Sequence, residues 1–142
     1  MYSKILIAVD LSSEFTAVLK AGKALADALH IPAHAIYCME PPIMPFGEIA
    51  ALPIMPDFSQ LKDELLPYFT EQAASVGINA ELISIEIGYP TDRILAVAKS
   101  IEADLIIVGS HGYHGLRLLL GSTSNGILHH AACDILAIRI HP

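Results

Sequence analysis

The chain has 142 residues, which suits one domain that buries about two-thirds of the surface its unfolded form exposes. Hydrophobic residues make up 54% and charged residues 16%, a balance that favours a sheet buried on both faces over an open antiparallel one. The formal net charge is -7 and only eight Lys and Arg occur, so we expect neither nucleic acid nor an anionic membrane as a partner.

The first forty residues predict two buried strands joined by a helix. Continuous apolar runs cover residues 5–9 and 33–39, and each run stops at an acidic residue, Asp10 or Glu40. The helix between them is expected to begin at Ser13, with small residues on its buried face that allow close packing on a sheet. The predicted buried stripe is Ala17, Ala21, Ala24, Leu25 and Ala28.

Residues 41–57 hold five of the nine prolines and are apolar. Proline excludes a long helix or a central strand here. Two interpretations remain, and we favour the first. The stretch is a loop that packs over the edge of the sheet, or it is a lid that covers a bound base or a partner, since methionine suits adaptable apolar contacts.

The next stretch predicts helix, strand and helix. Asp57 or Ser59 is expected to cap a helix that runs to about Ser75, with a kink or restart at Pro67. Residues 80–86 alternate between apolar and polar, which indicates a half-exposed strand near a sheet edge. Thr91 is then expected to cap a helix with a buried stripe made of Ile94, Leu95, Val97, Ala98 and Ile101.

Residues 104–126 carry the strongest functional signal. A run of branched apolar residues, 105–108, predicts a buried strand, and four glycines follow within thirteen positions. Ser122-Thr123-Ser124 then marks the start of a helix. Glycine lets the backbone approach a ligand, and the N–H groups of a helix start attract anions, so the unit predicts a phosphate site. The alternative is a flexible connection with glycines for clearance.

Together with a final strand over residues 135–140, strands and helices alternate five times. Such alternation predicts an α/β fold, in which helices cover both faces of a parallel, doubly wound sheet. Right-handed crossovers restrict the topology, but the alternation alone does not fix the strand order.

The glycine-rich stretch resembles the nucleotide-binding signature of the universal stress proteins, which is Gly, two residues, Gly, nine residues, then Gly-Ser or Gly-Thr. Gly109, Gly112 and Gly121-Ser122 match it, although the spacer of residues 113–120 has eight residues. The start, Ile5-Leu-Ile-Ala-Val-Asp-Leu-Ser12, the turn Gly88-Tyr-Pro90 and the end, Cys133-Asp-Ile-Leu-Ala-Ile-Arg139, resemble the same family. The resemblance covers residues 1–142 as one adenine-nucleotide α-hydrolase-like domain.

This resemblance implies a five-stranded sheet of order 3-2-1-4-5 with two helices on each face. Strands 1 and 4 are then neighbours, and ligands bind open α/β sheets at such a switch point. The implied ligand is ATP, with AMP and ADP as alternatives and Mg²⁺ accompanying the phosphates. The implied binding residues are Ala8, Val9, Asp10, Cys38, Val108, Gly109, His111, Gly112, Arg117, Gly121, Ser122, Thr123 and Ser124.

Several of these residues have a second interpretation. Asp10 would meet a ribose hydroxyl or an adenine amine, or it would only cap the first helix or form a turn. Arg117 would neutralise a phosphate, or it is a solvated loop residue. Ser122 or Ser124 would present a hydroxyl to a phosphate or simply cap the helix. His129 and His130 are adjacent on a helix and so face different directions, and His111 and His114 have no Cys or carboxylate close in sequence, so we expect no dedicated metal site.

Three functions are compatible with these features. The chain is a nucleotide-dependent regulator or sensor of a stress response, a slow ATPase or adenylate-transferring enzyme, or a dimeric scaffold that binds no nucleotide. We favour the first, with at most very slow hydrolysis, because few groups for phosphoryl transfer surround the loop. The resemblance also implies a homodimer through strand 5, residues Ile135 to Ile140.

The remaining features predict a cytoplasmic protein. Cys38 and Cys133 have no disulfide-framework spacing, which indicates two buried free thiols in a reducing compartment. The first residues show no signal-peptide pattern, and no apolar run approaches the ~20 residues of a membrane span.

Overall fold

In the computed structural model, which describes residues 1–41, 57–110 and 122–140, five parallel strands form one sheet. Their order is β3-β2-β1-β4-β5, as predicted. The strands are β1 (Ile5–Val9), β2 (Ala33–Met39), β3 (Ile83–Ile87), β4 (Leu105–Ser110) and β5 (Asp134–Arg139). The helices are α1 (Phe15–Leu29), α2 (Phe58–Ser75), α3 (Pro90–Ser100) and α4 (Ser122–His130), with a 3-10 turn, η3 (Ala80–Leu82), before β3.

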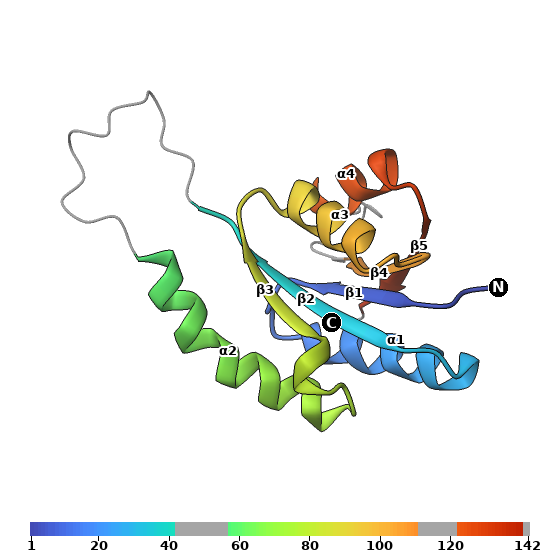
Figure 1. The fold of residues 1–142 in the computed structure, drawn as a ribbon, viewed down its shortest axis with the longest axis horizontal. Coiled ribbons are helices and arrows are strands. Elements are labelled where there is room, and N and C mark those ends of the chain that lie inside the picture. Colours follow the sequence, from blue (N-terminus) through green and yellow to red (C-terminus); the bar gives the residue numbers. More distant parts are fainter. Residues whose placement is uncertain (42–56, 111–121, 141–142) are drawn as a thin grey trace.

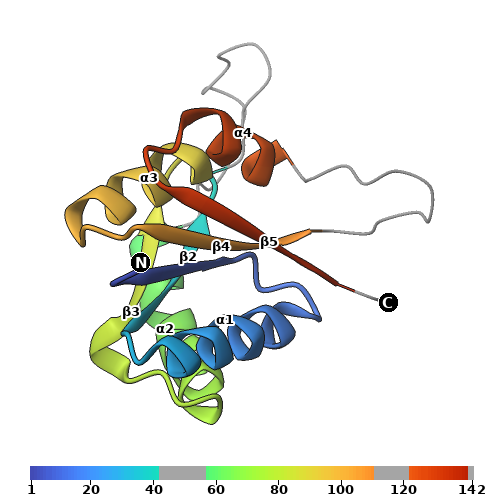
Figure 2. The same cartoon turned by 90° about the vertical axis from the view of Figure 1, so that its right-hand side faces the viewer.

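Two helices cover each face of the sheet, so the predicted layers are confirmed (Figures 1 and 2). Alternate residues of β1 enter different cores: Ile5 and Ile7 pack with α1 and α2, whereas Leu6 and Ala8 pack with α3 and α4. All five residues of β1 are buried. A strand buried on both faces reads as a continuous apolar run, which is why β1 could be predicted from the sequence.

The buried face of α1 differs from the predicted stripe. Its buried residues are Phe15, Val18, Leu19, Gly22 and Ala26, whereas Ala17, Ala24 and Ala28 are exposed. The larger side chains remove more apolar surface from water, and they follow helical spacing as well as the alanines do. The glycine allows close packing, because a Cβ at Gly22 would lie 2.6 Å from Cδ1 of Ile7.

Two helices also start at residues other than those predicted. α1 begins at Phe15 instead of Ser13, without a side-chain cap. α3 begins at Pro90, and Thr91, the predicted cap, is buried in the first turn. Proline suits the first turn of a helix because its missing N–H would have no partner there. The prediction that Asp57 caps the start of α2 is confirmed, since its carboxylate accepts hydrogen bonds from two backbone N–H groups.

Three further bounds were predicted incorrectly or only in part. α2 runs as one helix through Pro67, without a restart. β3 begins at Ile83 because η3 occupies residues 80–82. β5 lies one residue earlier than predicted, at 134–139, and Ile140 follows it. β3 is an edge strand, as its alternating pattern indicated. Residues 42–56, most of the proline-rich stretch, lie outside the described residues.

None of the helices in the described ranges is long and apolar enough to cross a membrane.

At the amino-terminal edge of the sheet, Asp104 joins the first residues of the chain to β4. Its Oδ2 accepts from Oγ and the backbone N–H of Ser3, at 2.7 and 2.8 Å, and its Oδ1 accepts from the N–H of Lys4 at 3.0 Å. The hydrogen bond from the Ser3 hydroxyl, followed by the Lys4 bond, lowers the pKa of Asp104 below its ordinary value of 3.8.

A lowered carboxyl pKa stabilises the fold above the ordinary value, and this contribution is lost as the pH falls through the folded value. Asp104→Asn should therefore lower the urea midpoint at neutral pH, and the difference from the original chain should shrink below pH 3.8. Urea titrations across this range, with Asp63→Asn on the exposed face of α2 as control, measure the effect. A constant difference at every pH would contradict the assigned role.

Candidate functional site

A cleft of about 420 Å³ opens at the carboxyl ends of β1 and β4. β1 and β4 lie side by side, with Ala8 opposite Val108. The helix that follows β1, α1, and the helix that follows β4, α4, lie on different faces of the sheet (Figure 2). This reversal is where open parallel sheets bind ligands. The cleft is lined by Ala8, Val9, Asp10, Phe15, Val18, Tyr37, Cys38, Glu40, Pro90, Ile94, Val108, Gly109, Thr123, Ser124, Ile127 and Ile140.

The cleft brings together eight of the thirteen residues predicted to bind a nucleotide. These are Ala8, Val9, Asp10, Cys38, Val108, Gly109, Thr123 and Ser124. Ser122 begins α4, but its side chain is not among those described. His111, Gly112, Arg117 and Gly121 lie outside the described residues.

Asp10 follows β1 directly and reaches the cleft from an exposed position. Its Oδ1 accepts a hydrogen bond from the backbone N–H of Ser12 at 3.0 Å, so Asp10 forms the turn that one interpretation predicted. A carboxylate has about four acceptor positions, so this bond is compatible with a ligand contact. The neighbouring Leu11 has a φ of 54°, which costs an apolar residue about 1 kcal/mol.

Gly109 lies in a confined position near the end of β4. A Cβ there would lie 2.8 Å from Cδ1 of Ile140 and 2.9 Å from Cγ2 of Val18, so only glycine fits without movement. The hydroxyl of Ser124 donates to the carbonyl oxygen of Gly109 at 3.4 Å. This bond joins the first turn of α4, where N–H groups lack partners within the helix, to the strand that ends at the cleft.

A model of the Universal stress protein family matches residues 1–139. The chain belongs to the universal stress protein family. Universal stress protein A homolog 2 of Coxiella burnetii is 38% identical over 143 residues, covering 98% of this chain and 96% of the relative. The family assignment made from the glycine motif and the first and last strands is therefore confirmed.

Solved structures of other universal stress proteins share the fold. One, in complex with cAMP, aligns with a TM-score of 0.66 at 19% identity and covers 97% of both chains. The universal stress protein from Archaeoglobus fulgidus, in complex with dAMP, aligns with a TM-score of 0.62 at 18% identity, covering 96% of this chain and 97% of that one. At such identities the likeness shows the fold.

Half of the residues that line the cleft of this universal stress protein were not predicted. They are Phe15, Val18, Tyr37, Glu40, Pro90, Ile94, Ile127 and Ile140. Two carried a usable signal. Glu40 follows β2 just as Asp10 follows β1, and the carboxyl ends of parallel strands share one edge of a sheet. Pro90 belongs to the Gly88-Tyr-Pro90 turn that carried part of the family resemblance.

No group of three or more His, Cys, Asp or Glu that could hold a metal ion occurs in the part of the chain that the structure describes.

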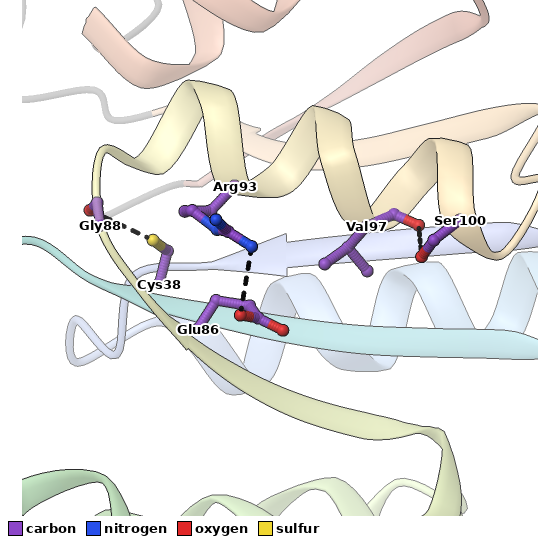
Figure 3. Close-up of polar contacts among 6 residues, drawn as sticks. All are labelled: Cys38, Glu86, Gly88, Arg93, Val97 and Ser100. Carbon is purple, nitrogen blue, oxygen red and sulfur yellow. Dashed lines mark hydrogen bonds and ion pairs between the residues drawn. The ribbon is translucent and has the colours of Figure 1, made fainter. Parts of the chain in front are cut away.

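Cys38 forms part of a network at the end of β2 (Figure 3). Its thiol donates to the carbonyl oxygen of Gly88 at 3.5 Å, and the N–H of Gly88 donates to the carbonyl of Met39 at 3.0 Å. Gly88 has a φ of 145°, and a Cβ at this position would lie 2.9 Å from Cδ of Arg93. Arg93 forms an ion pair with Glu86, with 3.7 Å between Nη2 and Oε2. The turn before α3 is thus fastened to β2.

Burial, followed by the charge of Glu86, raises the pKa of the Cys38 thiol from 9.0 to about 11. The thiol is therefore neutral at pH 7, which suits its role as a donor to Gly88. Cys133 was predicted to be buried, but it is half-exposed. Its pKa is also raised, by burial and then by Asp134.

Cys38 should react with thiol reagents about a hundredfold more slowly than an ordinary exposed thiol, because the thiolate is the nucleophile and its fraction falls with the rise from 9.0 to about 11. Cys133→Ser isolates Cys38, and N-acetylcysteine in the same reaction is the reference thiol, because the pKa of Cys133 is itself raised. Mass spectrometry after timed alkylation at pH 8 measures both rates. Reaction of Cys38 at the rate of a free thiol would contradict the network.

Proposed function

We propose that this universal stress protein binds an adenine nucleotide, ATP in the first instance, in the cleft between β1 and β4, and that nucleotide occupancy regulates or senses a stress response. The observation that carries the proposal is convergence. An aspartate after β1, a glycine of β4 and the first turn of α4 meet at one cleft, at the switch point of the sheet.

Each part of the cleft has a role in this proposal. The first turn of α4, with Thr123 and Ser124, offers N–H and hydroxyl donors and the positive end of a helix dipole to the phosphates. Gly109 borders the ribose and α-phosphate. Apolar walls that include Ala8 and Val108 enclose the base, and backbone groups near Cys38 read its edge.

Related structures support an adenine nucleotide. Two universal stress proteins of the same fold were solved with cAMP and with dAMP, and both ligands carry adenine and a single phosphate. ATP extends this ligand by two phosphates, which Mg²⁺ would accompany. His111, Gly112, Arg117, Gly121 and Ser122 complete the proposed site. Because the sequence around the loop offers few groups for phosphoryl transfer, we expect ATP turnover below about one per second, at the low end for enzymes.

Asp10→Asn should weaken ATP binding about tenfold, because a hydrogen bond to a charged group contributes about 1.5 kcal/mol or more. The amide keeps an oxygen for the Ser12 N–H, so the turn is preserved. Asp57→Asn is the matched control, since Asp57 also accepts from backbone N–H groups but caps α2 away from the cleft.

Isothermal titration calorimetry with ATP and with adenosine measures these affinities. Equal ATP affinity for both variants and the original chain would remove Asp10 from the site. Absence of binding by the original chain would leave a dimeric scaffold as the function.

A homodimer through β5 is the second part of the proposal. In the described chain β5 pairs only with β4, so its other edge presents unpaired N–H and C=O groups. Leu136 and Ala137 are exposed on it. Antiparallel pairing of two β5 strands would satisfy these groups and cover the apolar side chains.

The free thiols of Cys38 and Cys133 fit a reducing compartment, and we propose that the dimer is cytoplasmic.

Leu136→Asp should shift the protein from dimer to monomer at micromolar concentration, because the pairing would bring two added charges together in a buried position. Leu66→Asp on α2 is the matched control, since Leu66 is 37% exposed and Leu136 is 38% exposed. Sedimentation velocity separates the two species. A monomeric original chain, or a dimer that survives Leu136→Asp, would contradict pairing through β5.

A further inference from the structure

Helices α3 and α4 touch at a threonine and a glycine that have no role in the proposed site so far. Thr91, in the first turn of α3, is 7% exposed. A Cβ built on Gly126 of α4 would lie 2.7 Å from Oγ1 of Thr91, 3.1 Å from its Cγ2 and 3.5 Å from its Cβ. Glycine inside a helix costs about 1 kcal/mol relative to alanine, so close approach gives this one a structural reason.

The two helices that meet here also form two walls of the cleft. α3 supplies Pro90 and Ile94, and α4 supplies Thr123, Ser124 and Ile127. Thr91 and Gly126 are next in sequence to Pro90 and Ile127 but are not among the lining residues. Their contact therefore joins the two walls through residues that do not line the cleft.

Among the described residues, more contacts join the α3 wall to the sheet than join the α4 wall. The Gly88–Met39 hydrogen bond joins the turn before α3 to β2. The Cys38–Gly88 hydrogen bond joins the same turn to β2, and Arg93 of α3 pairs with Glu86 (Figure 3). The start of α4 is joined to the sheet through the single Ser124–Gly109 bond of 3.4 Å among the described residues. A change at the Thr91–Gly126 contact should therefore move α4.

We propose that the Thr91–Gly126 contact is a positioning device that fixes the phosphate-binding end of α4 relative to the walls that hold the nucleoside. The inference rests on the proposed nucleotide site. A Cβ at Gly126 must move away from Thr91 by roughly 0.7 Å to reach an ordinary contact of about 3.4 Å, and catalytic and binding groups must be held within about 0.5 Å. The β-branched, buried Thr91 has few other rotamers to accept the change.

Gly126→Ala should weaken ATP binding about tenfold, since a displacement of 1 Å can cost up to a hundredfold. Adenosine, which has no phosphate to reach α4, should bind within twofold of the original affinity. The ratio of the two affinities is the readout, because a general loss of folding would lower both together. Asn125→Ala, an exposed neighbour on the same helix, should leave both affinities unchanged.

Thr91→Ala in the Gly126→Ala background should restore the ratio, because it removes Oγ1 and Cγ2 and leaves only a Cβ at the ordinary distance of 3.5 Å. Thr91→Ala alone completes the double-mutant cycle and gives the effect of this substitution by itself. Calorimetry gives the affinities, and circular dichroism confirms that each variant folds. If Gly126→Ala fails to fold, Thr91→Ala alone, which removes Oγ1 and Cγ2 and lets α4 move toward α3, should lower the ratio, and an unchanged ratio would contradict the inference.

Two results would overturn the inference alone: an unchanged ratio in the folded Gly126→Ala protein, or a lowered ratio that Thr91→Ala does not restore. Failure of the original chain to bind either ATP or adenosine would overturn the proposed function, and this inference with it.

Discussion

The order in which strands are added to the sheet reverses between β1 and β4, and this is the constraint on which the rest of the structure depends. From β1 the chain winds one way, through α1, β2, α2 and β3, and α3 then carries it back over the other face to β4. α1, which follows β1, and α4, which follows β4, lie on different faces of the sheet (Figure 2). The cleft follows from this topology, and the residues after each strand end determine its chemistry.

The cleft joins rigid apolar walls to polar groups that enter from loops and a helix end. Ala8 and Val108 belong to buried strands, and Gly109 is confined by Ile140 and Val18, which leave no room for a Cβ. Asp10 supplies a carboxylate, and Thr123 and Ser124 supply donors. The Cys38 thiol, whose pKa burial raises to about 11, acts as a neutral link between strand and turn. Such a site suits a ligand with a flat apolar base at one end and negative charge at the other.

The sequence could predict the elements buried on both faces, because continuous apolar runs leave few alternatives: β1 and β2 have the predicted bounds. The sequence-based prediction failed where a helix had two possible apolar faces. In α1, Phe15 and Val18 face the sheet and the predicted alanine stripe does not. In the cleft, residues after a strand or in the glycine motif could be predicted. Ile140 and Val18 could not, because they reach Gly109 only through tertiary packing.

A crystal structure of the protein grown with ATP and Mg²⁺ tests the central claim most directly. The proposal predicts density for the base between the apolar walls near Ala8 and Val108, the ribose beside Asp10, and the phosphates at the first turn of α4. An empty cleft at saturating ATP, or a nucleotide bound elsewhere on the surface, would contradict it.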